Sequence, residues 1–171
     1  MAAELAKEFG LKLFNGGDIL KKLASEKGYV TACKDWWDGD DAKKFMVERQ
    51  NNPFFDREVD RILMEIAERG NAVITSYTLP WLTENPIKFW LRGSQDNRAK
   101  RMANRDKINL LDAKKIVQLR DDDNKKIYRK LYDINFGDDL TVFDLSLNTD
   151  ILSLKSLFEI SKNMIRHVLI K

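Results

Sequence analysis

The sequence predicts an α/β protein with a doubly wound parallel sheet that carries helices on both faces. Four short apolar runs have the length of strands, and segments with the spacing of amphipathic helices separate them. This alternation favours parallel strands that are buried on both faces. The predicted strands are LKLF (11–14), NAVITSY (71–77), IKFWL (87–91) and VFDLSL (142–147).

The size and composition of the chain are those of an ordinary globular domain. Its 171 residues are 43% hydrophobic and carry a net charge of +3, so we expect one domain over residues 1–171 with a substantial core and no general affinity for polyanions. The single cysteine, Cys33, excludes an intramolecular disulfide, which suits the reducing cytoplasm. No apolar run reaches the roughly 18–20 residues of a membrane span, so no membrane association is expected.

Helices are expected between and after the strands. In residues 55–69 one apolar stripe includes Val59, Leu63 and Ile66, and Gly70 ends the helix because glycine adopts a positive φ without a Cβ penalty. The same reasoning predicts helices at 1–9, 17–27, 38–50, 55–69, 94–104, 111–132 and 151–168.

The chain begins on a helix, which is an unusual start for a doubly wound sheet. Residues 1–9 have helical spacing, Gly10 is a good C-cap, and LKLF follows as a strand. In such folds a strand, a phosphate-binding turn and a helix come first, in that order. We therefore expect the first strand and the phosphate-binding turn to be missing from these 171 residues.

Four stretches, read in order, resemble nucleoside monophosphate kinases, and most closely the archaeal-type cytidylate kinases, which are P-loop NTPases. LAKEFGLKLFNGGDILKKLASEKG resembles a family segment close to G-D-I-F-R, and NNPFFDREVDRILMEIAERGNAVI resembles D-x-E-[IV]-D-R followed by a strand with E-G-R. IKFWLRGSQDNRAKRMANRDKI resembles the strand that leads into an arginine-rich lid, and LRDDDNKKIYRKLYDINFGDDLTVFDLSLNT resembles the helix after the lid and the last strand.

The resemblance implies ATP-dependent transfer of a phosphoryl group to a nucleoside monophosphate, CMP above all, with Mg²⁺ as the metal cofactor. It also implies a mobile nucleotide-pocket region at about 17–70 and a lid region at about 94–127. The G-x-x-x-x-G-K-[ST] loop that would hold the ATP phosphates is absent from the 171 residues, and the resemblance places it just before Met1. A kinase is therefore expected if that loop exists upstream.

The resemblance also implies roles for individual residues. Lid and post-lid arginines are expected to act in phosphoryl transfer, and five further residues are expected to bind the nucleotide. No metal-ligating residue is assigned. The catalytic set is Arg98, Arg101, Arg105 and Arg120, and the nucleotide-binding set is Gly17, Asp18, Lys21, Tyr77 and Asp121.

Three positions depart from the family pattern. Lys21 stands where G-D-I-F-R has its arginine, and lysine lacks the bidentate fork that suits phosphate. Tyr77 stands where E-G-R has its arginine, and Ile127 stands where R-E-x-x-x-x-R-Y has its second arginine. Because phosphoryl transfer depends on neutralising phosphate charge, the alternative is an impaired paralogue that serves as a nucleotide-binding or interaction protein.

Several of these features also have a purely structural interpretation. Arg98, Arg101 and Arg105 share one helical face, which is either a lid or a solvated basic surface. Asp18 precedes an apolar run, where an aspartate most often serves as a helix N-cap. The stretch DGDD (38–41) lacks the spacing of a calcium loop and is expected to be a turn followed by a helix start.

The sequence bears on two kinds of macromolecular partner. Residues 92–107 contain six basic and two acidic side chains, but no aromatic residue is interleaved for base stacking, so nucleic-acid binding is not expected. If a central strand is missing, its two neighbours each expose an unpaired edge, and an oligomer would cover those edges.

Overall fold

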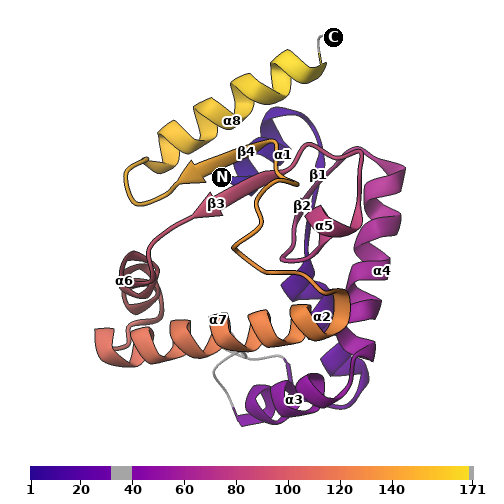
Figure 1. The fold of residues 1–171 in the computed structure, drawn as a ribbon, viewed down its shortest axis with the longest axis vertical. Helices are drawn as coiled ribbons and strands as arrows, with labels where there is room; N and C mark the ends of the chain where they lie inside the picture. Colours follow the sequence, from indigo (N-terminus) through magenta and orange to yellow (C-terminus); the bar gives the residue numbers. More distant parts are fainter. Residues whose placement is uncertain (32–39, 170–171) are drawn as a thin grey trace. The chain divides into compact units, whose positions relative to one another are not determined.

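The computed structural model describes residues 1–31 and 40–169, and the chain divides into two compact units (Figure 1). One unit is Ala2–Pro86, and the other is Ile87–Lys171 together with Met1. Each unit contains one pair of parallel strands and its own helices. The expectation of one domain over residues 1–171 stays a prediction.

The order of helices and strands agrees with the sequence prediction, and every expected element overlaps an observed one. Within the described residues, the short helix α5 is the one element that the sequence pattern does not predict. The helices are α1 (Ala2–Glu8), α2 (Gly16–Glu26), α3 (Asp40–Asn51), α4 (Phe54–Arg69), α5 (Leu79–Leu82), α6 (Gln95–Asp106), α7 (Leu110–Tyr132) and α8 (Leu154–Leu169). The strands are β1 (Lys12–Asn15), β2 (Ala72–Thr75), β3 (Phe89–Arg92) and β4 (Leu145–Asn148).

The four described strands form two separate parallel pairs. β1 pairs with β2, with Phe14 opposite Ile74, and β3 pairs with β4, with Trp90 opposite Ser146. The mixed α/β architecture with parallel strands therefore agrees with the predicted fold class. The single doubly wound sheet and the missing first strand stay predictions, since the strands pair only two by two.

The strand β4 begins later than the sequence pattern indicates, because residues 142–144 lie outside it. The N–H of Phe143 donates to the carbonyl oxygen of Leu140 at 3.1 Å, which makes a turn. The ring of Phe143 packs against Trp90, with 5.1 Å between the ring centroids. This apolar run is therefore covered in part by ring packing in its first half, and in its second half it pairs with β3 and buries Leu147.

The core of the Ala2–Pro86 unit gathers residues of α2, α3 and α4. Phe45, Phe55 and Leu63 are fully buried in it, and the first two rings meet edge-on, with 4.9 Å between their centroids. A buried ion pair lies between α3 and α4, where Arg49 Nη2 is 2.6 Å from Asp56 Oδ1 and Arg49 Nε also donates to this carboxylate. Each charge offsets the desolvation cost of the other.

Helix α2 begins directly after β1. Asn15 is its N-cap, with an extended backbone (φ −132°, ψ 123°) and a side-chain oxygen that accepts from the Gly17 N–H at 2.8 Å. The prediction that Asp18 is the N-cap is wrong, because the chain becomes helical at Gly16 and Asn15 already supplies the acceptor. Asp18 lies instead in the first turn, where the helix dipole favours a carboxylate.

Two helices end at glycines, as the sequence predicts. Gly10 (φ +64°) follows α1 and Gly70 (φ +70°) follows α4, and both lie in the left-handed region that favours glycine. The N–H of Gly70 donates to the carbonyl oxygen of Ala67 at 3.1 Å, which closes the last turn of α4. These two turns lead the chain into β1 and β2.

The second unit combines the β3–β4 pair with α8 and with a hairpin of two helices, α6 and α7 (Figure 1). The apolar contact between α6 and α7 has three small buried members, with further partly buried side chains packed against them: Ala99, Ala113 and Val117, then Met102, Ala103 and Ile108. In α8, Leu157 and Ser161 are buried. None of the described helices has the length and apolar character that crossing a bilayer requires.

Candidate functional site

The predicted site residues fall into two groups, one in each unit. Gly17, Asp18, Lys21 and Tyr77 belong to the Ala2–Pro86 unit, and the lid and post-lid residues belong to the other unit. Both groups begin where a parallel strand ends at its carboxyl end. That end is the usual ligand side of an open α/β sheet.

The first group includes the start of α2. Gly17 and Asp18 occupy its first turn, and Lys21 lies one turn further along the same face as Asp18. Asp18 is exposed and Lys21 is half-buried. A Cβ at Gly16 would lie 3.5 Å from the carbonyl oxygen of Thr75, so the start of α2 lies close to the end of β2.

Tyr77 lies in a turn whose two ends are hydrogen-bonded. The Ser76 Oγ accepts from the backbone N–H groups of Thr78 and Leu79, both at 3.2 Å. The Thr78 hydroxyl donates to the carboxylate of Asp60, and both of these side chains are buried. Tyr77 lies between Ser76 and Thr78 and is 58% exposed, so this hydrogen-bonded turn holds its phenol at the surface.

The sequence analysis does not single out Asn15, Asp60 or Thr78. The signal for Asn15 is its place between a strand and two glycines, where an asparagine is a good N-cap. The signal for Asp60 is that it adjoins Val59 on the apolar stripe of α4, where a buried acid requires a hydrogen-bond partner.

The second group begins where β3 and β4 end side by side. The Thr149 hydroxyl donates to the Arg92 carbonyl oxygen at 2.9 Å, and the Arg101 guanidinium lies 3.4 Å from the carbonyl oxygen and 3.3 Å from the hydroxyl of Thr149. A Cβ on Gly93 would lie 2.6 Å from the Thr149 Oγ1 and 2.8 Å from the Arg101 Nη2. Glycine at this position therefore leaves room for the arginine.

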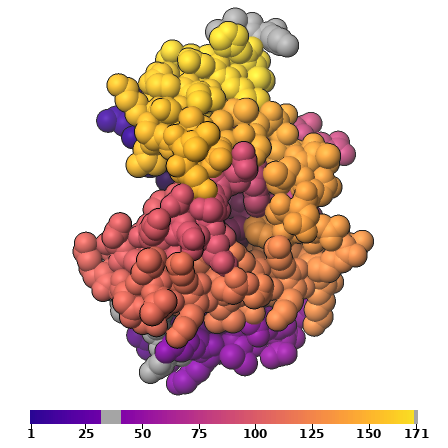
Figure 2. Space-filling model, turned by 60° about the vertical axis from the view of Figure 1, so that its left-hand side comes forward, coloured from indigo at the N-terminus to yellow at the C-terminus, as the bar shows by residue number. Residues whose placement is uncertain are grey.

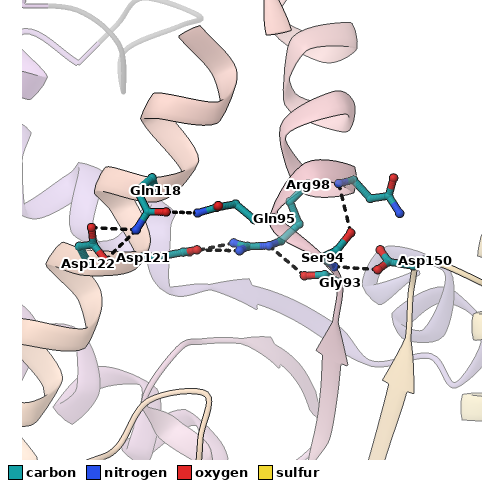
Figure 3. Close-up of polar contacts among 9 residues, drawn as sticks. Gly93, Ser94, Gln95, Arg98, Gln118, Asp121, Asp122 and Asp150 are labelled. Atoms are coloured by element: carbon teal, nitrogen blue, oxygen red, sulfur yellow. Dashed lines mark hydrogen bonds and ion pairs between the residues drawn. The ribbon is translucent and has the colours of Figure 1, made fainter. Parts of the chain in front are cut away.

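Ser94 and Asp150 fix the first turn of α6. The Ser94 Oγ accepts from the Asn97 N–H at 3.3 Å, and the Ser94 N–H donates to the Asp150 Oδ2 at 2.8 Å (Figure 3). The hydrogen bond from the Ser94 backbone, followed by one from the Asn97 side chain, lowers the pKa of Asp150 below its ordinary value. The loop after β4 is thus joined to the start of α6 through a carboxylate.

Arg98 connects α6 to α7. Its Nη1 and Nη2 donate to the Asp121 Oδ1 and Oδ2 at 2.8 and 2.6 Å, and its Nε donates to the Gly93 carbonyl oxygen at 3.1 Å (Figure 3). Arg98 and Asp121, which the sequence assigns to the site and which both fall in the expected lid region, are therefore in direct contact.

The other two arginines on this face of α6 have different partners. Arg105 Nε lies 2.6 Å from the Asp106 Oδ1, whereas Arg101 contacts Thr149. The hydrogen bond from Arg105, with a further contribution from the charge of Arg120, lowers the pKa of Asp106. The arginines thus have three distinct sets of contacts and do not point at one shared acceptor.

No three acidic, histidine or cysteine side chains gather within residues 1–31 and 40–169 in a way that would hold a metal ion. The DGDD stretch and Cys33 fall wholly or partly in residues 32–39, which lie outside the described part of the chain. The expectation of a turn and helix start there is confirmed only in that α3 begins at Asp40.

Comparison with known proteins gives one consistent family. The model of the cytidylate kinase-like family matches residues 1–151. A cytidylate kinase of Pyrococcus horikoshii is 32% identical over 169 residues, which cover 98% of this chain and 82% of that protein. One of Pyrobaculum islandicum is 32% identical, covering 99% and 86%, and one of Halorubrum lacusprofundi is 33% identical, covering 86% and 72%.

A solved structure has a similar fold. An uncharacterized protein from Eubacterium ventriosum superimposes with a TM-score of 0.62 at 18% sequence identity, and the match covers 99% of this chain and 90% of that one. At this identity the likeness concerns the fold alone.

Proposed function

This chain belongs to the cytidylate kinase-like family, and from that premise we propose that it transfers the terminal phosphoryl group of ATP to a nucleoside monophosphate, with CMP as the preferred acceptor. The observation that carries the proposal is the family match over residues 1–151, which includes the helical hairpin with its arginines. The transfer requires a phosphate-binding loop, and the 171 residues contain no G-x-x-x-x-G-K-[ST] stretch.

On this proposal the two groups of site residues divide the substrates between them. Gly17, Asp18, Lys21 and Tyr77 would contact the acceptor nucleotide at the carboxyl end of the β1–β2 pair. Their arrangement supports this role, because the exposed Tyr77 is held on a hydrogen-bonded turn and the half-buried Lys21 supplies a cation.

The lid arginines would handle the transferred phosphate. Arg101, Arg105 and Arg120 carry positive charge on α6 and α7, and neutralising phosphate oxygens is the main task of protein groups in phosphoryl transfer. Arg101 is the best placed of these, since its contacts with Thr149 are long and the Gly93 backbone lies beside it. Asp121 contacts Arg98 and would act through it.

ATP with Mg²⁺ is the donor that the family uses, and Mg²⁺ in such sites is usually held by one or two carboxylates together with substrate phosphates. Bound Mg²⁺ would neutralise charge on the transferred group. No particular carboxylate is assigned to it.

A second candidate is a kinase-fold protein that binds nucleotides without transferring phosphate. The observation that favours it is Ile127, which stands at a position of a family arginine and is 7% exposed, so that this position serves the core. Tyr77 and Lys21 also replace arginines of the pattern, and neither can make the bidentate contact of a guanidinium with phosphate.

One assay separates these two functions. The purified protein, in a version that carries the phosphate-binding loop, is mixed with ATP, Mg²⁺ and CMP, UMP or AMP, ADP formation is measured, and nucleotide binding is measured by calorimetry. The kinase proposal predicts turnover that is fastest with CMP, and it predicts that Arg101→Met lowers the rate about 10²-fold. Arg69→Met, at the exposed end of α4, is the control and should leave the rate unchanged.

Nucleotide binding without turnover would establish the second candidate. The absence of both binding and turnover would refute the two proposed functions. Salt-dependent binding to RNA or DNA oligomers in place of nucleotides would contradict the expectation that nucleic acid is not a partner.

We also propose that residues 17–70 and 94–127 move when nucleotides bind, and that association between chains covers unpaired strand edges. The first proposal rests on the family resemblance. The second rests on the two-stranded sheets, in which each described strand pairs with one neighbour.

A further inference from the structure

All three guanidinium nitrogens of Arg98 donate hydrogen bonds to groups of the same unit. Nη1 and Nη2 bind both oxygens of Asp121, and Nε binds the Gly93 carbonyl oxygen (Figure 3). One guanidinium therefore joins α6, α7 and the end of β3. Contacts of this bidentate, charge-assisted kind are among the strongest and most directional in proteins.

Other polar contacts link α6 to α7 on the same side. The Gln95 side chain donates to the Gln118 Oε1, and the Gln118 Nε2 donates to both oxygens of Asp122 at 3.0 and 2.9 Å (Figure 3). Lys114 Nζ also lies 2.7 Å from Asp96. Gln95, Lys114, Gln118 and Asp122 line a shallow groove of about 430 Å³ along the hairpin.

The buried part of the apolar contact within the hairpin is small. Its members are two alanines and one valine, and partly buried side chains pack against them: Ala99, Ala113 and Val117, then Met102, Ala103 and Ile108. Figure 2 shows the residues of α6 and α7, coloured salmon to orange, exposed over much of the face turned forward. Polar contacts must therefore carry more of the hairpin geometry than in a packed helix pair.

The alternative role for Arg98 is direct contact with a phosphate, and it has an electrostatic cost. The side chains of Arg98 and Asp121 are 37% and 29% exposed, so their charges are only partly screened by water. If Arg98 turned to a phosphate, the Asp121 carboxylate would lose its bidentate partner and would lie near a second anion.

We propose that Arg98 and Asp121 are positioning residues that hold the lid hairpin in shape, and that Arg98 does not itself contact phosphate. This inference rests on the proposed function only in so far as the hairpin is a lid over an anionic substrate. Arg101, one turn further along α6, then presents its guanidinium on a scaffold that the Arg98–Asp121 pair keeps rigid.

The test uses three variants of the full chain and one control. Asp121→Asn removes the charge of the acceptor, Arg98→Lys keeps the charge of the donor but removes its fork, and the third variant combines both. Asp123→Asn removes the same charge from α7 at a residue for which no contact with Arg98 is described. Amide hydrogen exchange of α6 and calorimetric binding of inorganic tripolyphosphate are measured for each.

The proposal predicts that both single variants speed the exchange of α6 amides about five-fold and that the double variant adds nothing further. It also predicts that Asp121→Asn weakens tripolyphosphate binding, whereas Asp123→Asn strengthens it slightly through the lost negative charge. Both variants change the net charge equally, so charge alone would shift the affinity in the same direction. A structural role for Asp121 predicts opposite signs, because only Asp121→Asn also loosens the hairpin.

Two results would overturn the proposal. One is unchanged α6 exchange in Asp121→Asn, and the other is a gain in tripolyphosphate affinity in Asp121→Asn that exceeds the gain in Asp123→Asn. The second result is what a phosphate-binding Arg98 would give once it is released from its carboxylate. A parent protein that carries the phosphate-binding loop and still binds no tripolyphosphate would refute the proposed function, and the exchange rates would still decide the role of the pair.

Discussion

Arg49 and Asp56 form an ion pair whose two side chains are each 7% exposed. Moving both charges out of water is costly, and the close bidentate geometry recovers that cost only while both partners are present. The surface pair of Arg61 and Glu58 lacks this dependence, because water solvates either charge when the other is removed. At the scale of single residues, burial therefore decides which ion pair matters for stability.

Arg49→Met is expected to lower the free energy of unfolding by about 3–5 kcal/mol, because it leaves the Asp56 carboxylate buried and unpaired. The matched double variant Arg49→Met with Asp56→Leu should recover most of that loss, since no buried charge remains. Urea unfolding followed by circular dichroism measures both. If the double variant is less stable than the single one, the pair does not act through its buried charge.

Gly93 is expected to be intolerant of a side chain for steric reasons. Gly93→Ala places a Cβ 2.6 Å from the Thr149 Oγ1, and overpacking of this kind costs about 1–3 kcal/mol. Adding Thr149→Ala removes the nearest atom, and the Arg101 side chain can turn aside, so the double variant should lose less than the sum of the two single losses. Strictly additive losses in thermal unfolding would contradict this steric account.

Helices α2 and α6 begin with side-chain caps, from Asn15 and Ser94. Asn15 is the last residue of β1, and Ser94 comes two residues after the end of β3, so each capping residue also fixes the direction in which the chain leaves the sheet. The proposed acceptor contacts Asp18 and Lys21 depend on the first of these starts. At the scale of elements, the caps thus set the geometry of both candidate site groups.

Asn15→Ala is expected to lower the free energy of unfolding by about 1 kcal/mol, because the Gly17 N–H loses its acceptor. Asp18→Ala should cost less, since Asp18 contributes through the helix dipole and not through the cap. Chemical unfolding of the two variants side by side tests the assignment. A larger loss for Asp18→Ala would restore Asp18 as the effective cap.

Asp150 makes the start of α6 sensitive to acid. Its pKa is lowered in the folded chain by the Ser94 backbone hydrogen bond, so the folded state binds the proton less readily than the unfolded one. The stabilisation is therefore complete above the unfolded pKa of about 3.9 and is lost as the pH falls through the lower folded value.

Asp150→Asn should accordingly flatten the decrease in thermal stability between about pH 5 and pH 2. Asp138→Asn, in an exposed turn, is the control for the loss of a carboxylate as such. Melting temperatures measured across this range check the expectation. Parallel curves for Asp150→Asn and the parent chain would contradict it.

At the scale of the whole molecule, each described strand carries apolar side chains but pairs with only one neighbour. Leu13 on β1 and Leu91 on β3 are each 44% exposed. Apolar strands with open edges favour association between chains, and charges placed on them prevent it.

Sedimentation velocity is expected to show a mass that rises with protein concentration. Leu13→Lys and Leu91→Lys together should reduce this association, because a charge on an edge strand blocks pairing with another chain. Val47→Lys, 60% exposed on α3, is the control and should leave it unchanged. A single monomeric species at every concentration would refute the proposal that chains associate.

Local patterns in the sequence predict the element positions well. The stripe through Val59 and Leu63 is buried, and Gly10 and Gly70 end their helices as expected, because these signals depend only on neighbours along the chain. The short helix α5 has too few residues to show a period.

The contacts within the candidate site depend on residues that are distant in sequence. Both Asn15 and Asp18 are residue types that cap helices well. Asn15 is the cap because β1 ends there and the chain becomes helical at the next residue. Arg98 and Asp121 are 23 residues apart, so their contact follows from how α6 packs on α7 and not from either helix alone. For the same reason the spacing of Arg98, Arg101 and Arg105 predicts a shared face but not their separate partners.

The pairing of β3 with β4 has a consequence for the order in which this unit folds. Lys88 and Asp144, which join the two strands at one end, are 56 residues apart, whereas α6 and α7 follow one another closely. Loop-closure entropy makes the distant pairing slow and the local one fast. The hairpin can thus form first and shorten the effective loop, so that it would help to assemble the strands from which it extends.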